Sequence, residues 1–146
     1  MTTRPRSGLF LDANVLFAAA VSPEGRSDAL FRQARAKRTV LMTSPHALEE
    51  ARRNLLARYP DTVARLESDL MPRVKLVPEA HPRRVADALG HGLPLKDAPI
   101  LAAAVESRAA MLVTGDRRDF GRLYGKAIEG VHIVSLREAL EHVTAL

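Results

Sequence analysis

The chain has 146 residues, of which 47% are hydrophobic and none is cysteine, and its formal net charge is +5. This composition argues against intrinsic disorder and excludes disulfide bridges and zinc sites ligated by cysteine. No apolar run approaches the ~20 residues that cross a bilayer, and Asp12 interrupts the apolar stretch that follows Arg4 and Arg6, so we expect a cytoplasmic protein with no signal peptide and no membrane contact.

The predicted elements alternate between short apolar strands and helices. A flexible, basic tail over residues 1–7 precedes one predicted domain over residues 8–146. The predicted strands cover residues 8–11, 39–42, 74–77, 111–113 and 131–134. The predicted helices cover residues 14–21, 27–37, 45–58, 61–70, 82–89, 97–108 and 135–143. This alternation predicts an α/β fold in which helices cover both faces of a parallel sheet.

Three of the predicted helices have recognisable start signals. Ser27 or Asp28 is expected to cap the helix that ends near residue 37. Ser44 before a proline combines a capping hydroxyl with the favoured first helical residue. Ser135, with Glu138 three positions later, predicts a capping box at the start of the last helix.

Four aspartates are expected to converge. Asp12 follows the first predicted strand and Asp116 follows the fourth, with Asp119 about one helical turn later. Asp97 begins the helix that leads into the fourth strand. Strands one and four commonly flank the point where strand order reverses in an open α/β sheet, and ligands bind there at the carboxyl ends of the strands.

A glutamate is expected to join these aspartates. The helix over residues 45–58 has an apolar face formed by Ala47, Leu48, Ala51 and Leu55. At 100° per residue, Glu50 lies on the border of that face, whereas Glu49 points further away. Glu50 is therefore the glutamate whose side chain is expected to lie at the edge of the core.

Each of these acids also has a simpler interpretation. Asp12 and Asp97 are both well placed to be helix N-caps. Asp116 suits an ordinary turn, and Glu50 suits a solvated helix surface. The functional interpretation depends on their combination, because several acids recur where separate parts of the chain should meet.

A divalent cation would explain such a cluster, because neighbouring carboxylates repel and resist ionisation. Oxygen ligands without cysteine favour Mg²⁺ or Mn²⁺. One or two such ions would activate water and stabilise the leaving oxygen of a phosphodiester.

The basic residues favour a polyanionic substrate or an acidic partner. Lysine and arginine number 22, against 17 acidic residues, and arginine predominates. The candidate phosphate contacts, adjacent to the acids in sequence, are Arg52, Arg53, Arg117 and Arg118. Each of them is equally well explained as a solvated surface charge.

The same segments resemble those of the PIN domain family, of the kind found in VapC-like toxins. The resemblance rests on LDANVL at residues 11–16, on Glu50 followed by Leu55, on DAPILA at residues 97–102, and on VTGD at residues 113–116 with Asp119 and Phe120. It covers nearly the whole chain, and the order and spacing of the motifs are more specific than any single motif.

This resemblance implies a three-layer α/β/α sandwich around a central parallel sheet of about five strands, and an endoribonuclease dependent on Mg²⁺ or Mn²⁺. It implies an acidic quartet of Asp12, Glu50, Asp97 and Asp116 around the metal. Asp119 would be a supplementary metal ligand, and Asn14 and Thr114 would orient the carboxylates that bind the metal. Many relatives are toxins of type II toxin–antitoxin pairs, which implies an antitoxin partner, and many dimerise, which implies a homodimer.

The leading hypothesis is a ribonuclease that cleaves single-stranded RNA. Water activated at a metal held by Asp12, Asp97 and Asp116 attacks phosphorus in line, and Glu50 completes the metal environment or removes the proton of the water. The alternatives are a non-catalytic RNA-binding or partner-binding module with the same fold, and a metal-dependent DNA nuclease.

Overall fold

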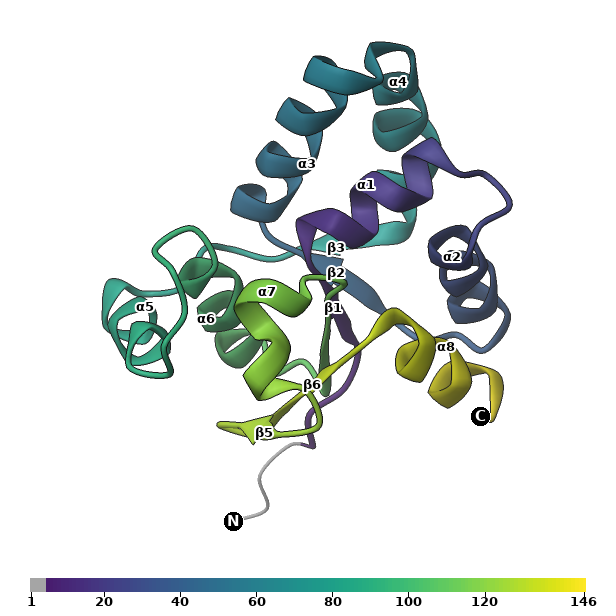
Figure 1. Cartoon of the computed structure of the whole chain (residues 1–146). Helices are drawn as coiled ribbons and strands as arrows, with labels where there is room; N and C mark the ends of the chain where they lie inside the picture. The colour runs from purple at the N-terminus through teal and green to yellow at the C-terminus, as the bar shows by residue number, and fades with distance from the viewer. Residues whose placement is uncertain (1–4) are drawn as a thin grey trace.

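A sheet of six strands forms the centre of the computed structural model, which describes residues 5–146 (Figure 1). The strands are β1 (Leu9–Leu11), β2 (Leu41–Thr43), β3 (Val74–Leu76), β4 (Met111–Val113), β5 (Ala127–Ile128) and β6 (Val131–Val134). Their order is β3-β2-β1-β4-β6-β5, and every pairing is parallel except that of β5 with β6. The predicted α/β fold around a parallel sheet is confirmed, and the two-residue antiparallel strand β5 is a sixth strand beyond the five predicted.

Strand order reverses between β1 and β4. From β1 the chain adds β2 and then β3 on one side, and it returns to place β4 on the other side of β1. Leu9 lies opposite Met111, and Leu11 lies opposite Val113. The carboxyl ends of β1 and β4 therefore meet at the reversal point, as the sequence predicted.

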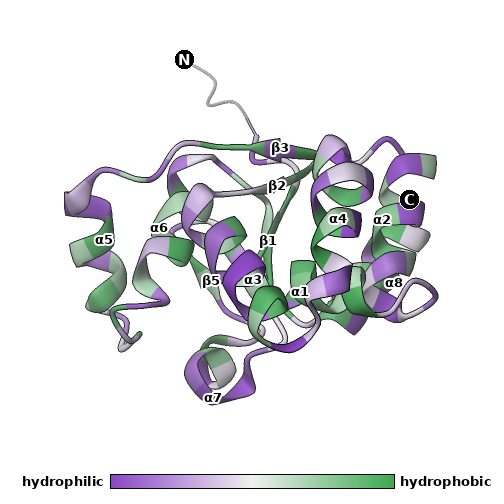
Figure 2. Ribbon diagram, turned by 90° about the horizontal axis from the view of Figure 1, so that it is seen from above, coloured by the Kyte–Doolittle hydropathy of each residue, from purple (hydrophilic) through white to green (hydrophobic). Residues whose placement is uncertain are grey.

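Helices cover both faces of the sheet. They are α1 (Ala13–Val21), α2 (Arg26–Ala36), α3 (Pro45–Arg58), α4 (Val63–Arg65), α5 (Pro82–Leu89), α6 (Ala98–Glu106), α7 (Arg117–Phe120) and α8 (Leu136–Thr144). Figure 2 shows α5 and α6 on one side of the strands and α1, α2, α4 and α8 on the other. Helix α1 also packs against α3, which brings these two helices together above the ends of β1 and β2.

The apolar strands are the reason for this arrangement. Phe10, Leu112 and Ile133, from three adjacent strands, have no exposed surface. Strands buried on both faces need an apolar helix on each side. Helix α6 supplies one such surface, with Leu101 only 1% exposed, and it covers most of the helix predicted over residues 97–108.

Several predicted helix boundaries agree with the structure. Helices α3 and α5 cover the predicted ranges 45–58 and 82–89. The Ser44 hydroxyl accepts a 3.3 Å hydrogen bond from Ala47 N. Ser135 and Glu138 form the predicted capping box, with the side chain of each accepting a hydrogen bond from the backbone of the other.

The predicted cap of α2 is wrong. The helix begins at Arg26, one residue before the predicted Ser27, and Gly25 occupies the N-cap position without a side-chain hydrogen bond. Ser27 and Asp28 are buried, and Asp28 forms an ion pair of 2.6 Å with Arg65 of α4. Asp28 thus ties α2 to α4, a tertiary contact that local sequence does not reveal.

The helix predicted over residues 61–70 is present as an irregular helical segment. The chain there winds through the short turns η1 (Pro60–Thr62), α4, η2 (Leu66–Leu70) and η3 (Met71–Arg73), which change between 3₁₀, α and π geometry. Leu66 and Leu70 are buried, and η2 packs against α1. The irregular winding places these two leucines against the core.

At the N-terminus, the first four residues of the predicted tail lie outside the described residues. Arg6 and Ser7, also assigned to the tail, are hydrogen bonded to the domain: Arg6 Nη1 donates to Val105 O at 3.0 Å, and Ser7 N donates to Arg108 O at 3.1 Å. Within residues 5–146, no helix has the length and apolar character needed to cross a membrane.

Candidate active site

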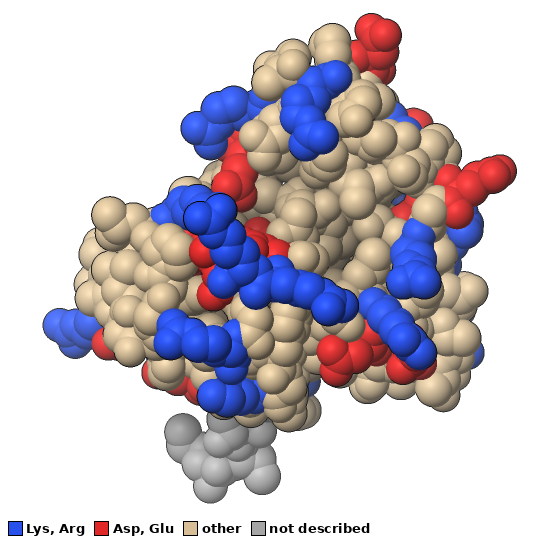
Figure 3. All heavy atoms as spheres, in the orientation of Figure 1, with Lys and Arg blue, Asp and Glu red and all other residues tan. Residues whose placement is uncertain are grey.

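A pocket of about 310 Å³ opens at the carboxyl edge of the sheet, where β1 and β4 meet. Its carboxylates are Asp12, Glu50, Asp97 and Asp116. Figure 3 shows acidic atoms inside a hollow on this face of the molecule, with basic side chains lying across them. The fold therefore gathers into one cavity four of the five acids that were predicted to converge, and Asp119 does not line it.

Asp12 connects the end of β1 to the start of α1 and is only 2% exposed. Its Oδ1 accepts a 2.7 Å hydrogen bond from Ala13 N, so the predicted capping role is real. Its Oδ2 accepts hydrogen bonds from Thr114 Oγ1 at 2.8 Å and from Asn14 Nδ2 at 3.2 Å. Burial raises the pKa of Asp12 to about 6; these donors oppose the rise, and the negative charge of Glu50 adds to it.

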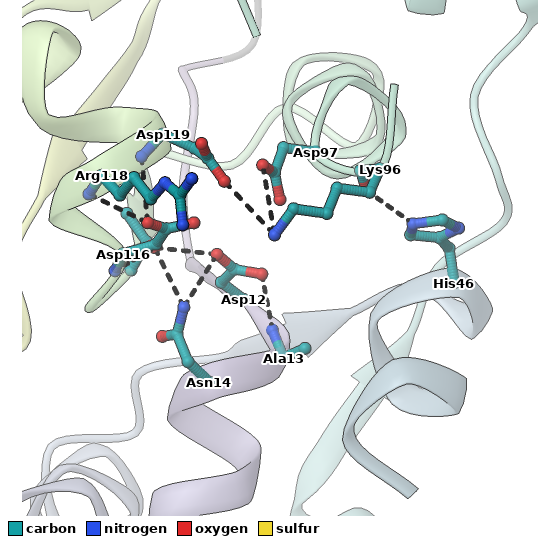
Figure 4. A network of polar contacts seen from close by, with 10 residues as sticks. Asp12, Ala13, Asn14, His46, Lys96, Asp97, Asp116, Arg118 and Asp119 are labelled. Atoms are coloured by element: carbon teal, nitrogen blue, oxygen red, sulfur yellow. Dashed lines mark hydrogen bonds and ion pairs between the residues drawn. The ribbon is translucent and has the colours of Figure 1, made fainter. Parts of the chain in front are cut away.

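Asn14 and Thr114 hold the ends of β1 and β4 together. Asn14 Oδ1 accepts from Gly115 N at 2.8 Å, and Asn14 Nδ2 also contacts Thr114 Oγ1 at 3.3 Å. Thr114 Oγ1 in turn accepts from Asp116 N at 3.0 Å. The two residues predicted to orient the acidic cluster thus contact Asp12 and the segment that carries Asp116 (Figure 4).

A tighter group of acids combines two carboxylates of the pocket, those of Asp97 and Asp116, with that of Asp119. Asp97, Asp116 and Asp119 each contribute a carboxylate oxygen to a set whose members all lie within 4.8 Å of one another. Asp116 accepts hydrogen bonds from Arg118 N and Asp119 N, both at 3.0 Å, and so caps α7. Asp12 faces the same pocket but lies outside this group of three.

Asp97 is not the helix cap that its position suggested. It precedes α6 but makes no capping hydrogen bond with its side chain, which is 3% exposed. Its buried Oδ2 has no hydrogen-bond partner among residues 5–146. Burial, together with the neighbouring Asp119 carboxylate, raises the pKa of Asp97 to about 7, and the charge of Lys96 opposes this rise.

An unsatisfied buried carboxylate is costly, and a cation removes the cost. The donor set around Asp97 consists of carboxylate oxygens, the ligands that Mg²⁺ and Mn²⁺ prefer. The residues present therefore fit a divalent ion, with Asp97, Asp116 and Asp119 as the group that could hold it.

The two adjacent glutamates of α3 point in different directions. Glu50 is half-buried and lines the pocket. Glu49 is exposed and forms an ion pair with Arg52, Nη1 to Oε2, at 3.0 Å. The helical periodicity thus distinguished the two glutamates correctly.

Lys96 was not predicted to belong to the site. Its Nζ lies 3.2 Å from Asp119 Oδ2 and 3.9 Å from Asp97 Oδ2, and Figure 4 shows the side chain reaching across toward these acids. The carbonyl of Lys96 is 2.8 Å from His46 Nε2, which fixes its backbone. Its position immediately before Asp97 in the sequence could have indicated that it belongs to the site.

The four predicted phosphate contacts differ in their surroundings. Arg52 pairs with Glu49 and, at 2.8 Å, with Glu67, and it does not line the pocket. Arg53, Arg117 and Arg118 are exposed, and the Arg118 side chain lies beside Asp116 in Figure 4.

A fifth arginine, Arg58, lines the pocket and was missed. The signal was present in the sequence, because Glu50, Asn54 and Arg58 are spaced four residues apart along α3 and so follow one stripe of the helix. All three line the pocket.

Comparison with known families identifies the domain. Residues 8–118 match the family profile of the PIN domain, in agreement with the resemblance inferred from the motifs. A comparison with curated protein sequences found no match.

Solved structures share the fold. The structure of VapBC2 from Rickettsia felis bound to a DNA fragment from their promoter matches 87% of this chain and 97% of that chain, with a TM-score of 0.68 and 15% identity. DNA-bound VapBC from Salmonella typhimurium matches 89% of this chain and 98% of that chain, with a TM-score of 0.65 and 17% identity. VapC20 from Mycobacterium tuberculosis, a toxin that cleaves the sarcin–ricin loop, matches 84% of this chain and 98% of that chain, with a TM-score of 0.59 and 18% identity.

Proposed function

This chain belongs to the PIN domain family, and we propose that it is an endoribonuclease that requires Mg²⁺ or Mn²⁺ and cleaves single-stranded RNA. One observation carries the proposal. The buried Asp97 has a carboxylate oxygen without a hydrogen-bond partner among residues 5–146, with the Lys96 ammonium 3.9 Å away, and it lies in a group of acids whose oxygens are within 4.8 Å of one another. A purely structural role for Asp97 would leave that oxygen unsatisfied.

Asp97, Asp116 and Asp119 would hold the ion, and Asp12 would lie beside it as a further ligand. When bound, a divalent ion supplies positive charge that favours the ionisation of water and stabilises charge on phosphate oxygens. The raised pKa values of Asp12 and Asp97, about 6 and about 7, make both residues good partners for a cation, because the cation relieves the repulsion and burial that favour their protonated forms.

The remaining residues of the site would position the reactants. Glu50 faces Asp12 from α3, and we assign it the acceptance of a proton from the attacking water. Thr114 and Asn14 hold the Asp12 carboxylate through the hydrogen bonds described above. A carboxylate held by two donors cannot rotate freely, so its oxygens stay oriented toward the reaction.

Phosphate binding would come from the basic residues around the hollow. Arg117 and Arg118 lie on α7 directly beside Asp116, and Arg53 is exposed on α3. Arg52, already paired with two glutamates, would have to exchange a partner in order to contact a phosphate. Binding through such residues should weaken as the salt concentration rises.

The structural neighbours support a role as the toxin of a toxin–antitoxin pair. Those described above include VapBC complexes from two bacteria and a toxin that cleaves the sarcin–ricin loop. On this basis we propose a small antitoxin as a protein partner of this chain, and from the family resemblance we propose a homodimer.

Cleavage of labelled oligonucleotides tests the proposed activity. We expect the full-length protein with Mn²⁺ to cleave single-stranded RNA, and EDTA to stop the reaction. Asp12→Asn should lower the rate by about 100-fold or more while leaving the melting temperature of the protein close to that of the wild type. Full activity of Asp12→Asn would remove Asp12 from the mechanism.

The same assay distinguishes the alternatives. Cleavage of a matched DNA oligonucleotide in preference to RNA would indicate a DNA nuclease. Binding of RNA without cleavage, in Mn²⁺ and in Mg²⁺, would indicate a binding module that has kept the fold.

A further inference from the structure

The pocket extends beyond the acids toward the end of α3. There it is lined by Phe17 of α1 and Arg58 of α3, and Tyr59 follows Arg58 in the chain. The rings of Phe17 and Tyr59 meet edge to face, with centroids 5.9 Å apart and planes inclined at 62°. The guanidinium carbon of Arg58 lies 5.2 Å from the Phe17 centroid and 5.5 Å from that of Tyr59. We call these three residues the aromatic–arginine group.

The group is accessible rather than part of the core. Tyr59 is 41% exposed, Phe17 is half-buried and Arg58 is exposed. Among residues 5–146, Arg58 forms no ion pair with a carboxylate, unlike Arg52 on the same helix and Arg65 on α4. Its contacts are with the two rings, so its charge and its planar surface remain available to a ligand.

The group lies within reach of the acids. Helix α3 places Arg58 eight residues beyond Glu50, which is about 12 Å along the helix axis at a rise of 1.5 Å per residue. Phe17 follows Asp12 by five residues, or about 7 Å along α1. Asn54 also lines the pocket and lies between Glu50 and Arg58 on α3. Its amide could therefore hydrogen bond to a ligand that extends from the acids to the aromatic–arginine group.

We infer that Phe17, Arg58 and Tyr59 form a stacking site for one unpaired nucleobase of a nucleic acid whose neighbouring phosphate lies at the carboxylates. Unpaired bases stack on aromatic rings and on arginine planes, and every base has such a face. A base inside a duplex is already stacked, so this site would favour single-stranded substrates with little preference for sequence. The inference rests on the proposed function, because it assumes a nucleic-acid ligand.

A purely structural role is the competing explanation. The Phe17–Tyr59 contact joins α1 to the end of α3 and would stabilise the domain without any ligand. The two roles differ in what they predict for Arg58, because an exposed arginine contributes little to stability but would be needed to stack on a base.

Fluorescence of a stacked base provides the test. The full-length protein is titrated, in EDTA so that no cleavage occurs, into a short single-stranded oligoribonucleotide that carries one 2-aminopurine. Stacking on the protein quenches this fluorophore, and anisotropy of the same probe reports the affinity. The variants are Arg58→Ala, Tyr59→Ser and Tyr59→Phe, and Arg26→Ala serves as the control because Arg26 is an exposed arginine on α2, away from the pocket.

We expect the wild type to bind the probe and quench it. Arg58→Ala and Tyr59→Ser should each lose the quenching and weaken binding by about tenfold, the usual effect of removing one base–side chain stack. Tyr59→Phe and Arg26→Ala should behave as the wild type does. If Tyr59→Ser does not fold, Arg58→Lys replaces it, because that variant keeps the charge, loses the plane and should lose the quenching.

Equal affinity and equal quenching in the wild type and Arg58→Ala would overturn the inference, as would a wild type that does not quench the probe. The cleavage assay separates this failure from that of the proposed function. A protein that cleaves RNA without quenching the probe lacks the stacking site but is a nuclease. One that quenches the probe without cleaving RNA has the stacking site and is not a nuclease.

Discussion

The hydroxyl of Thr114 donates a 2.8 Å hydrogen bond to Asp12 Oδ2, although the two residues are 102 positions apart in the chain. The same hydroxyl oxygen accepts from Asp116 N at 3.0 Å. Because Asp12 follows β1 and Thr114 follows β4, this contact exists only when the two strands are paired. One side chain therefore couples correct assembly of the sheet to the positions of two acids of the site.

Replacing Thr114 with valine tests this coupling. Thr114→Val keeps the shape of the side chain and removes the hydroxyl, and we expect cleavage to fall by about 10- to 100-fold, as for other groups that orient metal ligands. Because the hydrogen bond from Thr114 lowers the pKa of Asp12, its loss should move the acidic limb of the pH–rate profile to higher pH. Thr39→Val, remote from the pocket, is the control. An unchanged profile in Thr114→Val would show that Thr114 does not act through Asp12.

The raised pKa of Asp97 predicts that the metal-free protein becomes less stable toward unfolding as the pH rises. The folded state takes up a proton at pH values near 7, whereas the unfolded chain does so only near the ordinary value of 3.8. The contribution of Asp97 to stability is therefore greatest at low pH and is lost as the pH rises toward 7. Asp97→Asn has no charge to bury at this position. Between pH 5 and pH 8, its free energy of unfolding should therefore rise by about 1–2 kcal/mol relative to that of the wild type.

Urea unfolding in EDTA at pH 5 and at pH 8 measures this difference. The comparison is made between the two pH values for each protein, so any fixed effect of the amide cancels. A variant that loses stability relative to the wild type as the pH rises would contradict the assignment of a destabilising charge to Asp97.

Lys96 contacts oxygens that we propose as metal ligands. Its Nζ lies 3.2 Å from Asp119 Oδ2, and a neighbouring positive charge opposes the binding of a cation. Lys96→Met keeps the aliphatic chain and removes the charge, so we expect Mn²⁺ to bind about three- to tenfold more tightly. Isothermal titration calorimetry measures the affinity, with Arg26→Ala as a control for the loss of one positive charge. Weaker binding by Lys96→Met would mean that the lysine supports the ion rather than competing with it.

Burial of α6 predicts a severe effect of a charge in the core. Leu101 is 1% exposed, whereas Leu95, six residues earlier, is 78% exposed. Leu101→Asp should abolish the cooperative thermal transition, because it buries a carboxylate without a partner. Leu95→Asp makes the same chemical change in solvent and should melt as the wild type does. A cooperative, unshifted transition in Leu101→Asp would contradict the placement of α6.

The sequence revealed those parts of the fold that carry a clear local pattern, either an apolar run or a helix-start motif. Apolar runs located the central strands β1, β4 and β6, and a capping serine followed by Pro45 defined the start of α3. Helix α7 has four residues and β5 has two, too few for any periodicity to be recognised. The segment over residues 60–73 was predicted only in part, because its helical pattern does not reveal the changes between 3₁₀, α and π geometry.

Within the site, the acids were easier to predict than the bases. Parallel strands end at a common edge, so strand order alone brought the segments carrying Asp12 and Asp116 together. Long basic side chains can turn in many directions, and sequence adjacency did not reveal that Arg52 pairs with Glu67 or that Lys96 reaches Asp119. The ion-pair partner of each basic side chain depends on which residues the tertiary fold places beside it.

We propose that folding brings Asp97, Asp116 and Asp119 together to hold a divalent cation beside Asp12. The decisive measurement is anomalous scattering from a crystal of the full-length protein soaked in Mn²⁺. We predict an anomalous peak between the three carboxylates, with oxygen ligands from each of them. Carboxylates far apart, or an occupied manganese site elsewhere with no peak among these residues, would contradict it.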